Sequence, residues 1–204
     1  MVDKPGVNQT ALRVGRVAAS RATPDFYALQ LLNEILGGAY TSRLNANIRE
    51  EKGYAYGAFS RFDFGRAPGP FAVVTSVRSD ATAPAVKEID HELTRLMQKA
   101  PEASEFAQAR NSLVRSLPGA FETNAGISGA FANLFAYALP LDYYARLPAN
   151  LTGVLPIAVE QAARRYLNPS SMVVVAVGEQ ASLEPALESI GMKPVQTFTP
   201  ADLF

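Results

Sequence analysis

The 204-residue sequence contains no cysteine and a single histidine. The absence of cysteine excludes disulfide bonds, thiolate ligands to zinc and a cysteine nucleophile. It leaves open whether the protein is cytoplasmic or exported, because many exported proteins also lack cysteine. With only one histidine, this chain cannot form a metal site that needs two imidazoles.

The sequence also lacks an excess of either charge and a long apolar run. Its 19 Lys and Arg residues balance its 19 Asp and Glu residues, so no net field attracts nucleic acid, anionic lipid or acidic substrates. We therefore expect no nucleic-acid partner. Residues 1–6 hold no apolar run of signal-peptide length, and no later segment approaches the roughly 20 apolar residues of a membrane helix. We expect a soluble chain, and its start close to a strand-like stretch is typical of a piece of a longer protein.

Apolar residues are plentiful enough for one globular domain. They make up 48% of the chain, and no charge run or polar linker divides it. A chain of this length and composition can bury a core of its own. We therefore predict a single domain over residues 1–204.

The first part of the chain shows a strand pattern followed by a helix pattern. Residues 10–18 alternate in polarity, which predicts a strand. Thr23 is the predicted cap of a helix, Pro24 its first residue, and Gly37-Gly38 its left-handed stop.

A second short helix and a hairpin are predicted next. The helix is marked by an apolar repeat of four residues, Tyr40, Leu44 and Ile48. Arg49 falls in its last turn, and Gly53 ends it. Residues 54–64 and 71–77 are rich in aromatic and β-branched side chains and predict two antiparallel strands.

The second part of the chain is dominated by helix patterns. Amphipathic helices are expected at residues 86–97 and 106–117, at 156–166 and near 183–190. A buried strand is expected at 172–177, after a glycine- and alanine-rich stretch at 125–138. This order predicts an α+β fold, a two-layer sandwich of helices on a mostly antiparallel sheet. The predicted core includes Leu32, Ile35, Leu44, Ile48, Leu93 and Val174.

The single histidine does not predict a metal site. His91-Glu92 resembles the opening of a zinc-peptidase helix motif, but the position one turn later is Arg95, whose cation repels zinc. His91 lies opposite the apolar stripe of its helix, so we predict a solvated surface histidine and no metal ligand in this chain. A serine triad is also disfavoured, because no Gly-x-Ser-x-Gly elbow is present.

Two other polar patterns are interpreted as structural. The glycine clusters lack the lysine of a phosphate-binding loop and the spacing of a dinucleotide-binding turn, so they predict turns and close packing. Glu50 and Glu51 adjoin on a helix and point in different directions. We expect both carboxylates on the surface rather than paired in catalysis.

Arg49 and Tyr56 form the one constellation that suggests chemistry. The segment that carries them joins a helix to a strand, so both side chains could project from the same end of the sheet. A guanidinium and a phenol can donate hydrogen bonds to a peptide carbonyl, or to the oxyanion formed when water attacks it. The residues alone leave a second interpretation open, because arginine favours helix C-termini and strand tyrosines usually pack.

Several stretches resemble a known protein family. The main ones are Leu31-Leu32-Asn33-Glu34-Ile35-Leu36-Gly37-Gly38, Ser42-Arg43-Leu44 and Arg49-Glu50-Glu51-Lys52-Gly53-Tyr54-Ala55-Tyr56. Further matches are Pro5-Gly6 with Gln9, Leu141-Asp142-Tyr143-Tyr144 and Tyr166-Leu167-Asn168-Pro169 before residues 172–178. Together they resemble the C-terminal half-domain of the insulinase/pitrilysin family of zinc peptidases, which includes mitochondrial processing peptidase. The resemblance covers nearly the whole chain.

The resemblance implies a half-domain that has no zinc of its own. In this family, similar half-domains assemble around an enclosed chamber, and an inverted His-x-x-Glu-His motif with a distal glutamate holds zinc in another half-domain. One histidine cannot supply that motif. The implied partner is therefore a zinc-bearing half-domain or subunit, in a homo- or hetero-oligomer, and the implied substrate is a peptide.

The resemblance also implies roles for three residues. The arginine and tyrosine that reach the substrate in this family correspond to Arg49 and Tyr56, with the family's spacing. Tyr56 would meet the oxyanion or the adjacent backbone, and Arg49 would orient the substrate or hold Tyr56 in place. Tyr54 lies two residues from Tyr56 and is expected on the same strand face, where it contacts substrate or packs.

Three functions remain open at this point. The chain supplies substrate contacts to a zinc-bearing peptidase partner and is inactive alone, or it is a structural subunit like the core proteins of respiratory complexes. A structural subunit needs neither Arg49 nor Tyr56, so their joint presence favours the first. An unrelated α+β binding module would require accidental matches. Pro118-Gly119 departs from the longer helix of the family, which leaves the chamber wall and the substrate size open.

Overall fold

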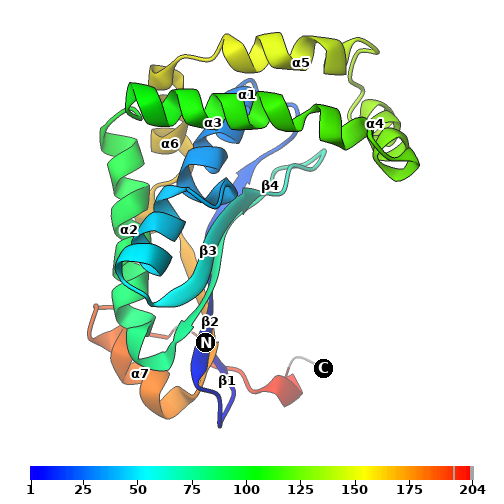
Figure 1. Ribbon diagram of the computed structural model, residues 1–204. Coiled ribbons are helices and arrows are strands. Elements are labelled where there is room, and N and C mark those ends of the chain that lie inside the picture. The colour runs from blue at the N-terminus through cyan, green and yellow to red at the C-terminus, as the bar shows by residue number, and fades with distance from the viewer. Residues whose placement is uncertain (195, 203–204) are drawn as a thin grey trace.

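A mostly antiparallel sheet with helices on one face forms the molecule (Figure 1). The structure is a computed structural model and describes residues 1–194 and 196–202. The strands are β1 (Val2–Asp3), β2 (Gln9–Ala19), β3 (Ala55–Phe62), β4 (Gly69–Arg78) and β5 (Val173–Gly178). Their order is β1-β5-β2-β4-β3; β1 and β5 pair in parallel, and the other neighbouring strands pair antiparallel. The predicted α+β layered fold is confirmed.

Helices cover one face of the sheet and extend beyond its upper end (Figure 1). The α-helices are α1 (Phe26–Asn33), α2 (Thr82–Gln98), α3 (Ala103–Ser116), α4 (Asn124–Ala136), α5 (Tyr143–Thr152), α6 (Pro156–Tyr166) and α7 (Gln180–Glu188). Two π-helical segments are η1 (Glu34–Gly38) and η2 (Asn45–Glu51). Short 3₁₀ turns span Ser79–Ala81, Pro118–Phe121, Pro169–Ser171 and Pro200–Asp202. Within the described ranges, none of the helices has the length and apolar character needed to cross a bilayer.

The core lies between the sheet and the helices. Of the predicted core residues, Leu32, Ile35, Leu44, Ile48 and Leu93 are buried, and Val174 is half-buried against the same cluster. The prediction that β5 is buried was wrong, because Val173 and Val175 are 64% and 42% exposed. Helices cover only one face of the sheet, so alternate side chains of β5 face solvent.

The first helix begins later than predicted, and the glycines at its end have a different role from the predicted one. Helix α1 begins at Phe26, two residues after Pro24. Gly37 and Gly38 are not a left-handed stop, since both belong to the π-helical segment η1. A side chain at Gly37 would collide with strand β3, because its Cβ would lie 2.4 Å from the Ser60 nitrogen. Glycine is required here for close packing.

Two helices were not predicted from the sequence. The glycine- and alanine-rich stretch forms α4, whose first turn is capped by the Thr123 hydroxyl, an acceptor for the Gly126 N–H at 3.0 Å. Helix α5 follows it. The predicted break at Pro118-Gly119 is confirmed as a 3₁₀ turn between α3 and α4.

Candidate functional site

A tight turn joins the segment that carries Arg49 to the strand that carries Tyr56. Gly53 adopts a φ of +63°, so the prediction that it ends the helix is confirmed. Its N–H donates to the Arg49 carbonyl at 3.2 Å, and the Tyr54 N–H donates to the Ile48 carbonyl at 2.9 Å. These bonds close the last turn of η2 and send the chain directly into the edge strand β3.

Arg49, Tyr54 and Tyr56 line one hollow of ≈440 Å³ at this end of the sheet. The other lining residues are Gln9, Glu50, Gly53, Ala55 and Arg78. Two guanidinium groups and two phenols therefore surround a solvent-open space. All of them can donate hydrogen bonds, which is the property needed to hold carbonyl oxygens.

Neighbouring side chains preorganise the Arg49 guanidinium. Its central carbon lies 4.2 Å from the centre of the Tyr40 ring, a distance at which a cation and an aromatic face attract each other. Its Nε lies 3.4 Å from Glu50 Oε1. The Nη1 atom is buried and has no hydrogen-bond partner among the described residues. This donor is therefore unsatisfied inside the protein, and the rest of the side chain, 30% exposed, faces the hollow.

The two tyrosines of the hollow differ in exposure. Tyr56 is 91% exposed, and its hydroxyl makes no hydrogen bond to the described part of the chain. Tyr54 is half-buried and packs against both apolar clusters of the core. Tyr54 precedes the first residue of β3, and the register of β3 shifts between Ala55 and Ala58, so their shared strand face stays a prediction. Tyr54 has a packing role in addition to its place in the hollow.

Arg78 is a residue of the hollow that the sequence interpretation missed. Its Nε and Nη2 donate to the Asp80 carboxylate at 3.0 and 3.3 Å, and its Nη1 donates to the Gly53 carbonyl at 3.3 Å. The hydrogen bonds between Arg78 and Asp80 hold the pKa of Arg78 above its ordinary value and the pKa of Asp80 below its ordinary value. Arg78 reaches the hollow because β4 pairs with β3 there, and the sequence alone does not give that register.

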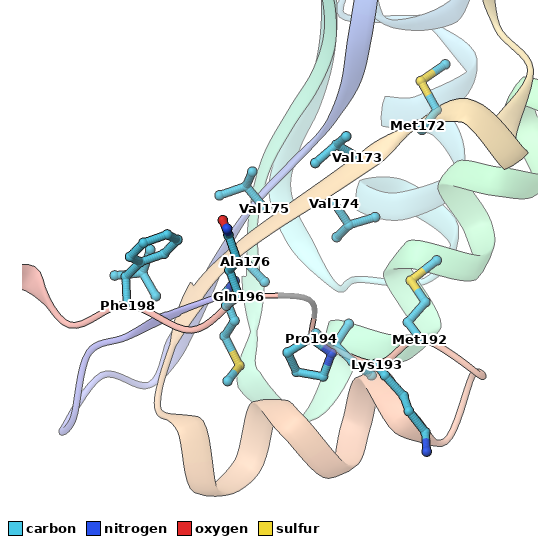
Figure 2. Close-up of a pocket in the computed structure, with 13 residues that line it drawn as sticks. Met172, Val173, Val174, Val175, Ala176, Met192, Lys193, Pro194, Gln196 and Phe198 are labelled. Atoms are coloured by element: carbon cyan, nitrogen blue, oxygen red, sulfur yellow. The ribbon is translucent and has the colours of Figure 1, made fainter. Parts of the chain in front are cut away.

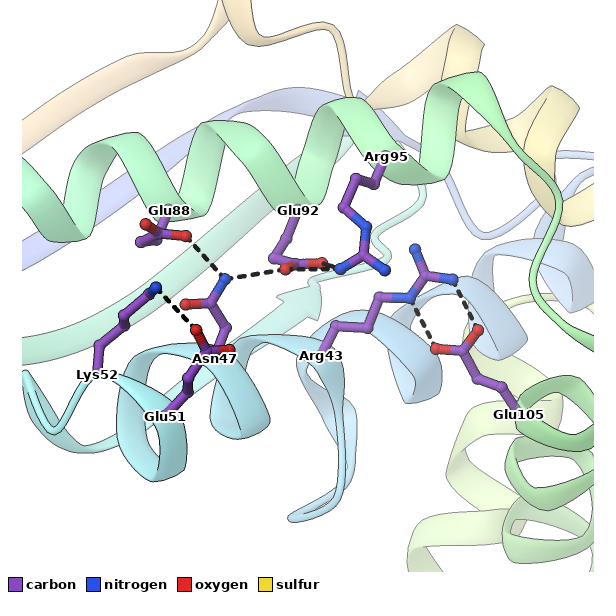
Figure 3. A network of polar contacts seen from close by, with 8 residues as sticks. All are labelled: Arg43, Asn47, Glu51, Lys52, Glu88, Glu92, Arg95 and Glu105. Carbon is purple, nitrogen blue, oxygen red and sulfur yellow. Dashed lines mark hydrogen bonds and ion pairs between the residues drawn. The ribbon is translucent and has the colours of Figure 1, made fainter.

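A network of charged and amide groups fixes η2 against helix α2 (Figure 3). Asn47 Nδ2 donates to Glu88 Oε2 and to Glu92 Oε1, both at 2.9 Å. Glu92 is buried and also accepts from Arg95 Nη1 at 3.0 Å. Asn47 Oδ1 is buried without a partner, but the bonds of its Nδ2 to two carboxylates of α2 tie the segment that carries Arg49 to that helix.

A second charged pair fixes the start of the same stretch of chain (Figure 3). The Arg43 guanidinium donates two hydrogen bonds to Glu105, at 2.7 and 2.6 Å. Burial alone would lower the pKa of Arg43, but the hydrogen bonds and charge of Glu105 raise it above its ordinary value. This fork geometry is the strongest form of ion pair available to arginine.

The chain's own residues do not fit a zinc ion. His91 is exposed on α2, as predicted for a surface histidine, and Arg95 one turn later is bonded to Glu92. Glu50 and Glu51 are exposed as well. Within residues 1–194 and 196–202, no group of three or more potential metal ligands lies close together.

A second hollow, of ≈430 Å³, lies beside strand β5 (Figure 2). Its walls are mainly apolar side chains of β5 and of the segment after α7, including Val173, Val175, Met192 and Phe198. It shares no lining residue with the hollow around Arg49 and Tyr56. Lys193 and Gln196 are its polar members, so it offers fewer groups that could act on a peptide bond.

Comparisons with known proteins show the family and the fold of the chain. Residues 1–113 match the family described as the peptidase M16 inactive domain. A peptidase M16 inactive domain from Pseudomonas fluorescens is 28% identical over 87% of this chain and 43% of that chain, with a TM-score of 0.80. A protease from Helicobacter pylori is 20% identical over 86% of this chain and 43% of its own, with a TM-score of 0.78.

The fold also occurs outside proteases. A chain of complex III2 from Candida albicans, 11% identical, covers 90% of this chain and 46% of its own, with a TM-score of 0.74. This chain spans less than half the length of all three of these structures. No curated protein matches the sequence. By its match over more than half of its length, the chain belongs to the peptidase M16 inactive-domain family, the C-terminal half-domain of the insulinase-type zinc peptidases.

Proposed function

We propose that this chain is the substrate-gripping half of a zinc-dependent endopeptidase, inactive alone, which completes the active site of a zinc-bearing half-domain or subunit. The observation that carries the proposal is the shared hollow of Arg49 and Tyr56. The Tyr56 hydroxyl has no partner among the described residues, and the Arg49 side chain, which lines the same hollow, is 30% exposed. Free donors in an open hollow suit the carbonyl oxygens of an extended peptide.

The proposed division of labour follows from what each partner can supply. In the assembled site, the zinc ion of the partner would provide an activated water molecule. In this chain, the Tyr56 hydroxyl donates to the oxygen on which charge develops, and the partly exposed Arg49 guanidinium holds a neighbouring carbonyl. Donors aimed at a developing charge stabilise the transition state more than the ground state.

Tyr54 and Arg78 complete the proposed substrate contacts. Tyr54 forms part of the floor of the hollow, where its ring packs on the core. Arg78 is held by Asp80 and by the Gly53 carbonyl, and the Asp80 carboxylate offsets its charge. A peptide backbone suits this wall, whereas an acidic substrate side chain would also meet the carboxylate of Glu50.

A structural role in a larger assembly is the second candidate. The similar fold of a chain of complex III2 from Candida albicans favours this alternative, although its 11% identity supports likeness of fold alone. The two candidates differ in one requirement. Only the peptidase role needs donors that remain free at Arg49 and Tyr56.

An add-back assay tests the proposal. The partner used is a subunit of the same family that carries the inverted zinc motif and comes from the same organism. We expect a fluorogenic peptide to remain intact with this chain alone and with the partner alone, and to be cleaved by the mixture. A stable complex with stoichiometric zinc that cleaves no member of a peptide library would contradict the proposal and favour the structural role.

A further inference from the structure

Tyr56 lies in an irregularity of strand β3. Ala55 pairs with Val77, and Ala58 pairs with Thr75. Three steps along β3 therefore match only two steps along β4, so β3 contains one extra residue at this point. This arrangement is a β-bulge, a feature that re-aims a side chain on an edge strand.

The bulge decides which way Tyr56 points. In a regular strand, residues two apart share a face. Ala58 and Ser60 lie on the buried face, with exposed fractions of 0% and 5%, whereas Tyr56 is 91% exposed. Without the extra residue, Tyr56 would share the buried face of Ala58. The bulge is thus the reason that the phenol reaches the hollow.

Two buried polar side chains hold this bulge in place. Asn45 Oδ1 accepts a hydrogen bond from the Ala58 N–H at 2.9 Å, and Thr75 Oγ1 donates to the Gly57 carbonyl at 2.8 Å. Asn45 is fully buried, and Thr75 is 4% exposed. These two bonds satisfy the C=O and the N–H of the peptide group between Gly57 and Ala58, at the point where the pairing of β3 with β4 is shifted.

Asn45 also connects the bulge to the segment that carries Arg49. It is the first residue of η2, four positions before Arg49. Its Nδ2 faces the Ala39 carbonyl and the Ser42 hydroxyl at 3.3 and 3.4 Å. A single side chain therefore bridges η2 and β3, the two elements that must keep their relative position if both donors are to reach one substrate.

We infer that Asn45 and Thr75 are positioning residues, which lock the bulge of β3 against η2 so that Tyr56 and Arg49 face the same peptide. Neither side chain lines the hollow, so both act through other residues. The inference deepens the proposed function and rests on it for its catalytic consequence. Its structural consequence can be measured without any activity.

The first test is amide hydrogen exchange in the isolated chain, followed by NMR. In Asn45→Ala the Ala58 amide loses its acceptor, and we expect its exchange to accelerate by on the order of tenfold or more beyond any general change. Asn47→Ala is the matched control. It removes a buried amide from the same segment, bonded to Glu88 and Glu92 instead, and should leave Ala58 protected once the overall loss of stability is subtracted.

The second test is turnover of the assembled peptidase. Misplacing Tyr56 through Asn45→Ala or Thr75→Val should lower turnover by roughly ten- to a hundredfold, with zinc content and assembly unchanged. Thr75→Val keeps the shape of the side chain and removes only the donor, so it covers the case in which Asn45→Ala does not fold. Thr75→Ser restores the hydroxyl and should restore turnover.

A double-mutant comparison separates positioning from general damage. If Asn45 and Thr75 act through Tyr56, the loss caused by Tyr56→Phe should shrink strongly in either background, because the hydroxyl is already misplaced. An unchanged Tyr56→Phe penalty in both backgrounds, or an Ala58 amide that stays protected in folded Asn45→Ala, would overturn the inference. If Tyr56→Phe has no effect in the wild-type complex, the proposed function fails, and the exchange experiment alone decides whether Asn45 holds the bulge.

Discussion

Arg49 and Tyr56 are held by the fold to different degrees. The ring of Tyr40 and the Glu50 carboxylate constrain the Arg49 guanidinium before any substrate arrives. The Tyr56 ring is almost fully exposed, and only its backbone is constrained. A preorganised arginine loses little entropy on binding, whereas Tyr56 must be ordered by the substrate or by the partner.

The first prediction concerns the fork geometry of Arg49. Arg49→Lys keeps the charge but loses the contact of the guanidinium with the Tyr40 ring and its fork of several donors, so the assembled peptidase should lose roughly ten- to a hundredfold in kcat/KM. Arg61→Lys is the matched control, because Arg61 is an exposed arginine of β3 paired with Asp63. Equal kcat/KM values for the two variants would show that Arg49 acts only as a charge.

The second prediction concerns Tyr143, a tyrosine of the core. Burial raises its pKa to about 12, above the value near 10 of an unfolded tyrosine. The folded state therefore holds the phenolic proton more tightly. The contribution of Tyr143 to the free energy of unfolding is fully present below pH 10 and is lost as the pH rises towards 12.

Urea denaturation at several alkaline pH values measures this contribution. The difference in free energy of unfolding between wild type and Tyr143→Phe should fall steadily above pH 10. A difference that stays constant through this range would mean that Tyr143 ionises equally in the folded and unfolded chain.

The segments η1 and η2 explain how helices and sheet fit together next to the hollow. Both are π-helical, a rare geometry that often occurs at functional sites. Segment η1 brings Gly37 against Ser60, and η2 brings Asn45 against Ala58, so both press on the edge strand β3. This coverage protects part of the edge from pairing with other strands.

The third prediction compares three Gly→Ala variants. Gly37→Ala should destabilise by about 1–3 kcal/mol, because its Cβ would lie 2.4 Å from a β3 backbone nitrogen. Gly53→Ala should cost about 1–2 kcal/mol through its positive φ alone, since nothing lies within 4 Å of its Cβ position. Gly129→Ala, in the middle of α4 with open space around it, should stabilise by about 1 kcal/mol.

Urea unfolding of the three variants checks the order of these effects. Destabilisation by Gly129→Ala, or a neutral Gly37→Ala, would contradict the local explanation given for each glycine.

Several elements could be predicted from the sequence because their signals are local. Helix α6 begins at Pro156 and ends at Tyr166, as the apolar spacing indicated. Gly53 could be recognised as a helix stop because a positive φ is a conformational property of one residue. The site residues Arg49 and Tyr56 came from motif spacing, and both line the same hollow. Their roles stay predictions.

Features that depend on pairing between distant segments could not be predicted. The bulge before Ala58 exists only relative to β4, and the parallel β1–β5 pair joins residues 2–3 to residues 177–178. Helix α4 was missed because its glycines and small residues give a weak helical pattern, although Thr123 caps it. Arg78 was missed because its place in the hollow depends on strand register.

At the scale of the whole molecule, exposed apolar side chains gather at two places in the described part of the chain. One is the open face of the sheet, where Val173 and Val175 of β5 are exposed. The other is helix α4 at the end of the arm formed by α3 and α5 (Figure 1). Helix α4 contains no charged residue and exposes Phe131 and Phe135 by 55% and 77%. Exposed apolar area of this kind is typical of a protein that has partners.

The fourth prediction follows from these exposed phenylalanines. Phe131→Ser with Phe135→Ser should lower the binding of a hydrophobic fluorescent dye to the folded chain, with little change in its thermal midpoint, because neither ring contributes much to the core. Phe106→Ser is the control, since its ring is buried and its loss should lower the midpoint by several degrees. Unchanged dye binding in the double variant would place the exposed apolar surface elsewhere.

The central claim is that the site is divided, with zinc on a partner and the substrate donors on this chain. The most direct measurement is the turnover of a fluorogenic peptide by the assembled complex with Tyr56→Phe, at matched complex concentration and zinc content. Tyr27→Phe serves as the control, because it removes a hydroxyl that bonds Asn150 outside the hollow. The account predicts a loss of on the order of a hundredfold or more in turnover for Tyr56→Phe alone, with folding unchanged. Wild-type turnover by an assembled, zinc-loaded Tyr56→Phe complex would contradict it.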